Sequence, residues 1–244
     1  MMASIRNRKG ATLIELIFSI AIMLVLAGSF YQLLISFYQN YEVQNAIAEM
    51  QQQGRVAVDL ISREIKQAGY DPTGEVFRED KPAKIKGRKV GCIEKEYNAE
   101  RIFQATSTIF HFLADLNANT QINDGAGKGD TDEHVRYEWV GADGIFACMD
   151  RKNNKPKRPY TLFRETGSGL QEVALNIESF RLDYFDESGA PIPSNALIDL
   201  SQRERIRKVV VTLRVRTERK DPQYGSNGGY RTRRFVSEVW LKNM

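Results

Sequence analysis

One segment near the start of the chain constrains the fold more than any other. From Leu16 to Tyr38 no residue is charged. About 20 apolar residues in a helix are enough to cross the ~30 Å hydrocarbon layer of a bilayer. The basic residues Arg6, Arg8 and Lys9 precede this run, and such residues next to a membrane helix stay on the cytoplasmic side. The pattern therefore predicts a membrane helix, with the rest of the chain outside the cytoplasm.

A cleaved secretory signal peptide is the alternative explanation of this segment. A signal peptide has a shorter apolar core, and its small-residue cleavage site follows that core. Here the small residue, Gly10, lies before the apolar run, and the run is longer than a usual signal core. Cleavage at Gly10 would remove only the basic leader and would leave the helix attached to the rest of the chain.

A single carboxylate, that of Glu15, stands at the start of the apolar run. An unpaired charge inside a bilayer costs about 2.5 to 3.5 kcal/mol on insertion scales, so such residues are usually functional and have a partner. The alternative is a carboxylate that reaches water at the edge of the membrane. The position of Glu15 relative to Gly10 and the basic leader favours a functional role.

The stretch KGATLIEL, residues 9–16, resembles the processing site of the type IV pilin family. The resemblance rests on the basic leader, on Gly10, on Glu15 five residues later and on the uncharged helix, all in register. It implies cleavage between Gly10 and Ala11 by a prepilin peptidase, followed by N-methylation of Ala11. Most family members have phenylalanine in place of Ala11, so the resemblance supports cleavage more directly than methylation.

The same resemblance gives the carboxylate of Glu15 a partner. In the family, this glutamate is thought to meet the N-terminal amine of a neighbouring subunit as helices pack into a filament core. A buried charge that lacks a partner is costly, whereas a paired one is much less so. The desolvation penalty of Glu15 would therefore favour ordered assembly.

An apolar stripe extends the predicted helix beyond the membrane. Apolar or small residues recur at steps of three or four, as in an amphipathic helix: Val43, Ile47, Met50, Gly54, Ala57, Ile61, Ile65 and Ala68. Gly69 and Pro72 then form a stop signal. We expect one helix from Ala11 to Ala68, whose second half packs its stripe against a sheet.

The sequence after Pro72 changes to short runs that alternate apolar and polar residues. Such runs predict strands with one buried face, and they lie at 107–115, 135–140, 179–185, 208–218 and 234–241. A helix followed by strands, without helices between them, favours an α+β architecture with an antiparallel sheet. The resemblance to pilins implies the same fold, a long helix packed on an antiparallel β-sheet.

These patterns divide the chain into four parts. We expect a cleaved basic leader (1–10), a transmembrane or filament-core helix (11–40), an amphipathic continuation of that helix (41–70) and a globular β-rich periplasmic head (71–244).

A polar segment at 115–134 is rich in oxygen ligands. Asp115, Asn117 and Asn119 have the one-three-five spacing that begins a calcium loop, and Asp124 follows. The sixth and twelfth positions are not the glycine and glutamate of an EF-hand. Some relatives have calcium-stabilised loops, so the resemblance implies calcium as a candidate cofactor. A polar loop rich in Asx turns is the alternative.

The two cysteines, Cys92 and Cys148, are an even number in a chain that leaves the cytoplasm, and this is compatible with a disulfide. Two separate small buried side chains are the alternative. The two histidines, His111 and His134, lack the sequence spacing of a zinc site, and His111 is expected to be structural. The sequence contains no convincing phosphate loop, nucleophile elbow or other catalytic constellation, and we expect the protein not to be an enzyme.

Arginines are frequent in the last third of the chain, and Arg214 and Arg216 would share one face of a strand. That face is a candidate anion-binding surface. A solvated sheet face, or a rim that contacts neighbouring pilins, is the favoured alternative, since arginine is common at such contacts. Without the leader, 32 basic residues oppose 31 acidic ones. The composition therefore gives little support to nucleic acid as a partner.

The stretch at residues 54–74, GRVAVDLISREIKQAGYDPTG, resembles the helix end of minor pilins of the PilW type. The resemblance implies a subunit anchored in the bacterial inner membrane with its head in the periplasm. Prepilin peptidase would process it, and the inner-membrane assembly platform would assemble it with other minor and major pilins. Its expected place is the tip of an extracellular type IV pilus that serves adhesion or motility.

Three other functions stay open. The same stretch also resembles the J-type pseudopilin of type II secretion. A DNA-binding competence pilin and a signal-anchored periplasmic enzyme are the remaining alternatives.

Overall fold

The computed structural model describes residues 12–78, 80, 84–86, 96–120, 122, 133–144, 157–166, 169–193 and 200–244. The chain divides into two compact units, residues 1–46 and residues 47–244. We call the second unit the head unit and describe each unit by itself.

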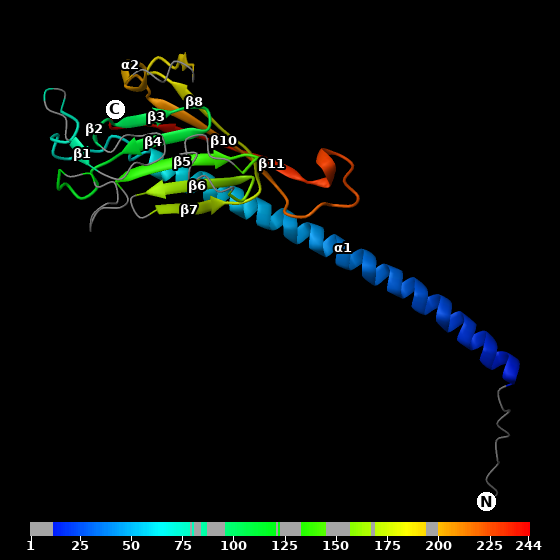
Figure 1. The fold of residues 1–244 in the computed structure, drawn as a ribbon. Helices are drawn as coiled ribbons and strands as arrows, with labels where there is room; N and C mark the ends of the chain where they lie inside the picture. The colour runs from blue at the N-terminus through cyan, green and yellow to red at the C-terminus, as the bar shows by residue number, and fades with distance from the viewer. Residues whose placement is uncertain are drawn as a thin grey trace, which may run out of the picture. The chain divides into compact units, whose positions relative to one another are not determined.

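One long helix, α1, precedes the strands (Figure 1). The described residues form the following elements: α1 (Leu13–Ile65), β1 (Lys84–Lys86), β2 (Glu96–Asn98), β3 (Ile102–Ala105), β4 (Ile109–Leu113), β5 (His134–Val140), β6 (Thr161–Thr166), β7 (Gly169–Ala174), β8 (Ile177–Phe185), β9 (Pro191–Ile192), α2 (Leu200–Arg203), β10 (Lys208–Arg216), a 3-10 turn (Asn227–Gly229) and β11 (Thr232–Trp240).

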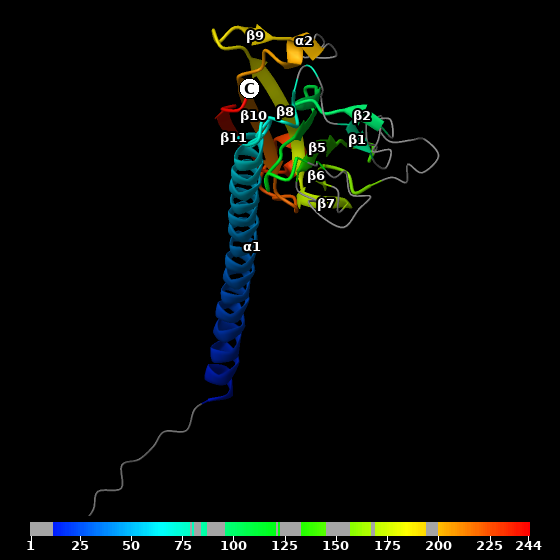
Figure 2. The ribbon, with the colours of Figure 1, turned by 90° about the vertical axis from the view of Figure 1, so that its left-hand side faces the viewer.

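The strands form antiparallel sheets. Five strands pair in the order β3-β4-β5-β6-β7, four pair in the order β11-β10-β8-β9, and β1 pairs with β2. The longest ladder joins β10 to β11, from Lys208 opposite Trp240 to Arg216 opposite Thr232. Figure 2 shows the larger sheets from the side, with β8, β10 and β11 behind the end of α1. The expected α+β, pilin-like fold is confirmed.

The predicted stripe of α1 lies in the main core of the head unit. Met50, Ala57, Ile61 and Ile65 are each at most 5% exposed. They join one cluster with side chains of both large sheets, such as Phe110, Tyr137, Leu182 and Val211. The second half of the helix is therefore fixed by burial of its apolar face, because helix propensity alone contributes little.

Close approach between α1 and β11 depends on a glycine. A Cβ atom added at Gly54 would overlap the ring of Phe235. About two turns further along the helix, the hydroxyl of Ser62 donates a hydrogen bond to that of Ser237 at 2.8 Å. The strand therefore lies directly against the helix backbone.

The helix ends at Ile65, three residues before the predicted Ala68, and a turn leads to the predicted stop residue, Gly69. Gly69 has φ of +72°, a left-handed conformation that glycine adopts without strain. Its N–H donates to the carbonyl of Leu113 at 2.8 Å, and an added Cβ would lie 2.9 Å from the carbonyl oxygen of Asn243. Both the conformation and the crowding favour glycine at this position.

A polar contact joins α1 to the five-stranded sheet. The carboxylate of Glu64 accepts hydrogen bonds from the hydroxyl of Tyr137 at 2.5 Å and from Nε of Arg164 at 2.8 Å. Burial, together with the negative charge of Glu64, raises the pKa of Tyr137, so the phenol stays protonated and donates. Local sequence spacing does not indicate this contact, because only the fold brings Tyr137 and Arg164 to the helix.

The sheet arrangement also differs from the simplest expectation. The sequence predicts strands at 107–115, 135–140, 179–185, 208–218 and 234–241, and the structure has β4, β5, β8, β10 and β11 there, with ends that differ by at most two residues. The sequence patterns did not predict β1, β2, β3, β6, β7 and β9, because these runs are short or lack strict alternation of apolar and polar residues. With these strands, the head unit has two large sheets in place of a single one.

The second face of the five-stranded sheet is also buried and is unusually polar. His111, His134, Arg136 and Glu138 are each at most 3% exposed. Arg136 pairs with Glu138 and, at 3.2 Å, with Glu165. The Nε2 atoms of the two histidines lie 2.5 Å apart, which requires that one ring donates and the other accepts. The neutral forms of both rings fit this contact.

Substitution of Gly54 by valine is expected to destabilise the head unit. The new methyl groups meet the Phe235 ring, and overpacking of this kind costs about 1 to 3 kcal/mol. Urea denaturation of the full chain in detergent would measure the loss. The matched control is Gly225→Val, since nothing lies within 4 Å of a Cβ at that position. Equal stability of the two variants would contradict this packing.

The head unit is expected to lose stability in mild acid. Burial, assisted by the charge of Arg136, lowers the pKa of His134 to about 4. Burial and the neighbouring His134 lower the pKa of His111 well below its usual range, with Arg136 and Arg203 adding to the effect. Both pKa values are lower in the folded than in the unfolded chain, so the stabilisation is complete above about pH 6.5 and is lost as the pH falls toward 4.

For His134 this loss is on the order of 2 kcal/mol between about pH 7 and pH 5. Urea denaturation at the two pH values measures it. The variant His134→Gln retains a polar group but does not titrate, and it should show a smaller pH dependence. A wild-type unfolding free energy that is constant over this range would show that the histidines are not buried as neutral groups.

Candidate assembly site

Glu15 lies in the first turn of α1, where its side chain closes that turn with Thr12. The backbone N–H and the hydroxyl of Thr12 donate to Oε2 of Glu15, at 2.8 Å and 3.0 Å. In return, the N–H of Glu15 donates to the hydroxyl oxygen of Thr12 at 3.4 Å. This reciprocal arrangement is a capping box, in which the two side chains satisfy donors that the first helical turn leaves open.

The capping box determines where the carboxylate stands. It holds Oε2 at the helix N-terminus, where the aligned peptide dipoles favour negative charge. Among the residues from Thr12 onward that the structure describes, Oε1 accepts no hydrogen bond. The carboxylate is thus partly stabilised by its own helix and still has an oxygen that can accept from a second cation.

The helix around this carboxylate is apolar and exposed on all sides. Every residue from Thr12 to Tyr41 is exposed in the unit to which it belongs, with Leu13 at 76%. By length and composition α1 can cross a membrane, and none of its most apolar stretch is buried. Apolar side chains exposed over such a length require lipid or other helices around them.

Residues 5–31 match the model of the prokaryotic N-terminal methylation motif. The chain is a prepilin-like protein. The match covers the basic leader, the start of α1 and most of the uncharged run, and its described residues, from Thr12 onward, are all exposed in their unit. No curated protein matched the chain in a sequence comparison.

The motif implies processing by prepilin peptidase and assembly with pilins, and the chain is a pilus or pseudopilus subunit in this general sense. Proteins of this kind are structural subunits and not enzymes. The exposed apolar helix is consistent with anchoring in the inner membrane before assembly. Gly10 and Ala11, the predicted cleavage and methylation positions, lie outside the described residues.

At the start of the candidate calcium loop, the carboxylates of Asp115 and Glu133 accept hydrogen bonds from backbone N–H groups. Oδ2 of Asp115 accepts from the N–H of Thr120 at 3.0 Å, and Oδ1 of Asn117 accepts from the N–H of Asn119 at 2.9 Å. Oε1 of Glu133 accepts from the N–H groups of Leu116 and Asn117 at 3.0 Å and 3.3 Å. The sequence reasoning missed Glu133, because only the fold brings it to this loop.

The structure describes Asp115, Asn117 and Asn119 of the predicted calcium ligands. Oδ1 of Asp115 is buried and has no hydrogen-bond partner, which leaves one carboxylate oxygen suited to a cation. The described residues include no group of three or more His, Cys, Asp or Glu side chains arranged to hold a metal ion. Asp124 lies outside the described residues, as do Cys92 and Cys148, the predicted disulfide partners.

The two arginines of the candidate anion-binding face are both engaged within the head unit. Nε of Arg214 lies 3.3 Å from a carboxylate oxygen of Glu178. The guanidinium of Arg216 stacks between the rings of Tyr160 and Tyr230, at 3.9 Å and 4.5 Å from their centroids. These contacts position a loop and a strand end, and they leave the two arginines less available to an external phosphate.

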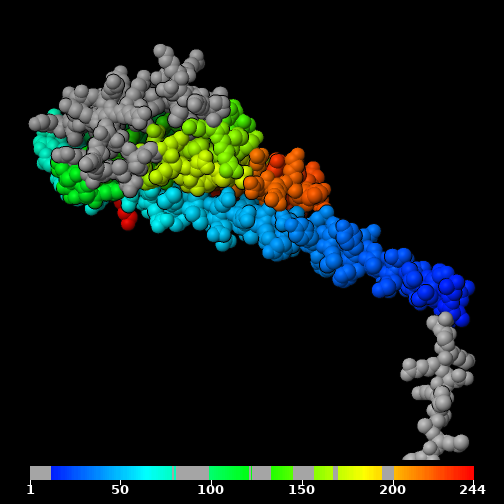
Figure 3. Space-filling view, turned by 60° about the horizontal axis from the view of Figure 1, so that its bottom comes forward, coloured from blue at the N-terminus to red at the C-terminus, as the bar shows by residue number. Residues whose placement is uncertain are grey.

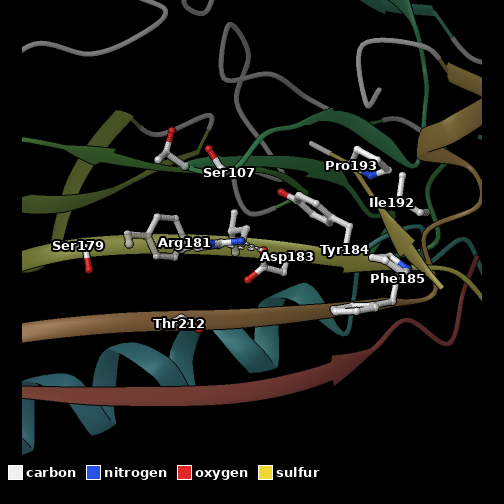
Figure 4. A pocket seen from close by; sticks show the side chains of 13 residues that line it. Ser107, Ser179, Arg181, Asp183, Tyr184, Phe185, Ile192, Pro193 and Thr212 are labelled. Carbon is white, nitrogen blue, oxygen red and sulfur yellow. Dashed lines mark hydrogen bonds and ion pairs between the residues drawn. The ribbon is translucent and has the colours of Figure 1, made fainter. Parts of the chain in front are cut away.

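A groove of about 840 Å³ runs beside β8 (Figure 4). Its lining includes Ser107, Arg181, Asp183, Tyr184 and Pro193. Arg181 is bound to the carboxylate of Asp183 at 2.8 and 2.9 Å, and the N–H of Leu182 donates to the carbonyl of Ser107. These polar groups of the groove are therefore hydrogen-bonded to one another, and the arrangement does not suggest a catalytic site.

Replacement of Thr12 by valine is expected to loosen the first turn of α1. Valine has the same shape but lacks the hydroxyl, and loss of an N-cap costs about 1 kcal/mol. Hydrogen exchange of the amides at residues 13–15, in the full chain in nanodiscs, should accelerate about fivefold. The control Thr12→Ser keeps the hydroxyl and should exchange like wild type. Equal rates in all three proteins would mean that the capping box is not formed.

Proposed function

We propose that the protein is a minor pilin of the PilW type, assembled at or near the tip of a type IV pilus. The observation that carries the proposal is a carboxylate at the start of a fully exposed apolar helix, within a methylation motif. Such a helix needs neighbours, and its one charge needs a cation among them.

The mechanism is assembly. Cleavage after Gly10 would create an amine at Ala11, one residue before the capping box. A subunit that moves from lipid into a filament would place its Glu15 carboxylate beside the amine of an adjacent subunit. The new ion pair offsets the desolvation of both charges, and a subunit docked out of register would leave them unpaired. The pairing would thus favour assembly and would fix the register of the subunit against its neighbour.

A tip position suits the head unit. Two large sheets and a long β10–β11 loop give its described part an irregular surface. Heads in a filament shaft pack closely against identical copies, and irregular loops hinder such packing. Immunolabelling of this subunit along the whole shaft would contradict a tip position.

The nearest alternative is a pseudopilin of a type II secretion system, which would carry the same motif and the same kind of helix. Genes next to the coding sequence would discriminate: a pilus motor and adhesin favour a pilin, whereas a secretin operon favours a pseudopilin. The engagement of Arg214 and Arg216 inside the head argues against a DNA-binding competence pilin.

We also propose that the loop after β4 binds calcium, with Asp115 as its main carboxylate ligand and with Asn117, Asn119 and Asp124 as further ligands. The support is the buried, unpartnered Oδ1 of Asp115 and the oxygen-rich sequence of the loop. Calcium favours such carboxylate and amide oxygens.

Processing is tested by the intact mass of the protein purified from its native membranes. The expected mass is that of a chain that begins at Ala11 and bears one added methyl group. The same analysis of a Gly10→Val variant should return the full-length, unmodified chain. A wild-type chain that keeps its leader, or that begins well after the apolar run, would contradict the assignment.

Calcium binding is tested by thermal unfolding of the full chain in detergent. Calcium at about 1 mM should raise the melting temperature by about 5 °C, and the chelator EGTA should reverse the shift. Magnesium at the same concentration serves as the control, and Asn119→Ala should reduce the shift. An identical melting temperature in calcium and in EGTA would overturn the proposal.

A further inference from the structure

Positive charge is concentrated in one hairpin of the head unit. Residues 214–234, which we call the basic hairpin, contain seven basic and two acidic side chains, a net charge of +5. The chain from Ala11 onward has a net charge of +1, so its other residues sum to −4. Of the two acids, Asp221 is buried and pairs with Arg231 at 2.7 Å. Glu218 is therefore the one exposed acid of the basic hairpin.

The basic hairpin is ordered by its own contacts. The N–H of Asp221 donates to the carbonyl of Gly229 at 2.7 Å, and the N–H of Thr217 donates to the carbonyl of Arg231 at 2.8 Å. Arg231 also lies over the ring of Tyr224, at 4.8 Å from its centroid. These bonds hold the strand ends together and fix the direction in which the hairpin presents its charges.

Several cations and two tyrosines reach the surface of this hairpin. Lys220, Arg233 and Arg234 are exposed, and Tyr224 and Tyr230 are half-buried. Figure 3 shows the hairpin surface in orange. Tyrosine beside lysine and arginine is the composition that anchors proteins at the membrane interface, where the ring lies among head groups and the cation meets phosphate.

Contacts along α1 show which end of the head unit carries the basic hairpin. Phe235 lies against Gly54, Ser237 binds Ser62, and Asn243 binds the carbonyl of Lys66. Residue numbers rise together along both elements, so β11 and α1 run in the same direction. The hairpin, whose last residues begin β11, therefore lies at the end of the head unit that contains residue 47.

Residue 47, at that end, begins the head unit and comes nine residues after Tyr38, the last residue of the uncharged run. Nine residues span at most about 30 Å even when fully extended. The chain therefore keeps this end of the head unit close to the apolar segment and to any bilayer around that segment. This connection and the charge of the basic hairpin point to the same partner.

We propose that the basic hairpin docks on the anionic phospholipid head groups of the inner membrane before the subunit is assembled. Each cation held near an anionic surface contributes roughly a fivefold factor to binding. Docking would orient the head on the bilayer and would be released when the subunit leaves the membrane. The proposal requires the membrane anchor but not a particular place in the filament.

The test uses the full chain in nanodiscs and follows hydrogen exchange of residues 217–231. In nanodiscs with about 30% phosphatidylglycerol in phosphatidylcholine, this segment should be more protected than in phosphatidylcholine alone. About 0.5 M NaCl should remove the difference, because it shortens the Debye length to roughly 4 Å. Equal protection in the two lipid compositions, or protection that survives salt, would overturn the proposal.

A matched pair of variants locates the effect. The double variant Arg233→Gln/Arg234→Gln removes two exposed cations from the basic hairpin and should reduce the lipid-dependent protection about thirtyfold. The control Arg205→Gln/Lys242→Gln removes two exposed cations at the opposite end of the β10–β11 ladder and should behave like wild type. Exchange in β10 and β11 verifies that both proteins are folded. Equal loss in both variants would mean that net charge, and not this hairpin, is responsible.

Nucleic acid is the competing partner for such a surface. Duplex DNA added to the protein in phosphatidylcholine nanodiscs should leave residues 217–231 unprotected at physiological salt. Protection by DNA without protection by phosphatidylglycerol would reassign the hairpin to nucleic acid. Failure of the chain to enter nanodiscs would instead contradict the membrane anchor, so the two proposals fail in different ways.

Discussion

The structure depends on the position of one carboxylate in an apolar helix. Glu15 is the single charge in the described part of the chain before Glu42, and it is held in the first turn by Thr12. The capping bonds reduce the cost of carrying this charge in lipid but do not remove it. In the proposed mechanism, pairing with the amine of a neighbouring subunit would offset the rest of this cost and would favour transfer from lipid into a filament. The exposed helix would supply the surface for that contact.

The two halves of α1 shield their apolar side chains from water in different ways. In the first half, apolar side chains cover every face, so lipid or other helices must surround it. In the second half, the apolar residues form one stripe, and the two sheets of the head unit bury it. Gly54 lets β11 approach the helix backbone, while Glu64 is satisfied by Tyr137 and Arg164. One helix thus serves as both an anchor and a structural element of the head.

Local patterns were enough to predict the helix, its end and several strands. The three-four spacing from Ile47 to Ala68 and the left-handed Gly69 are properties of neighbouring residues, and the structure confirms them. The capping box was also visible as Thr12 and Glu15 three residues apart, although the sequence reasoning did not use it.

Contacts between distant segments could not be predicted from such local patterns. His111 meets His134 only because β4 pairs with β5, and Glu133 reaches the loop after β4 for the same reason. The partners of Arg214 and Arg216 likewise come from β8 and from loops. Sequence spacing carries no information about such neighbours. The contact of the assembly site cannot be predicted from one chain for another reason: its proposed partner is an amine of another subunit.

In the proposed mechanism, the charge of Glu15 drives incorporation by pairing with an amine of another subunit. The most direct test compares wild type with Glu15→Gln, which keeps the shape and removes the charge, by quantifying this subunit in sheared filaments against its amount in the membrane. We predict that the variant is cleaved and inserted like wild type but that its filament-to-membrane ratio falls at least tenfold, on the order of 1.4 kcal/mol. An unchanged ratio would show that the charge of Glu15 does not drive incorporation.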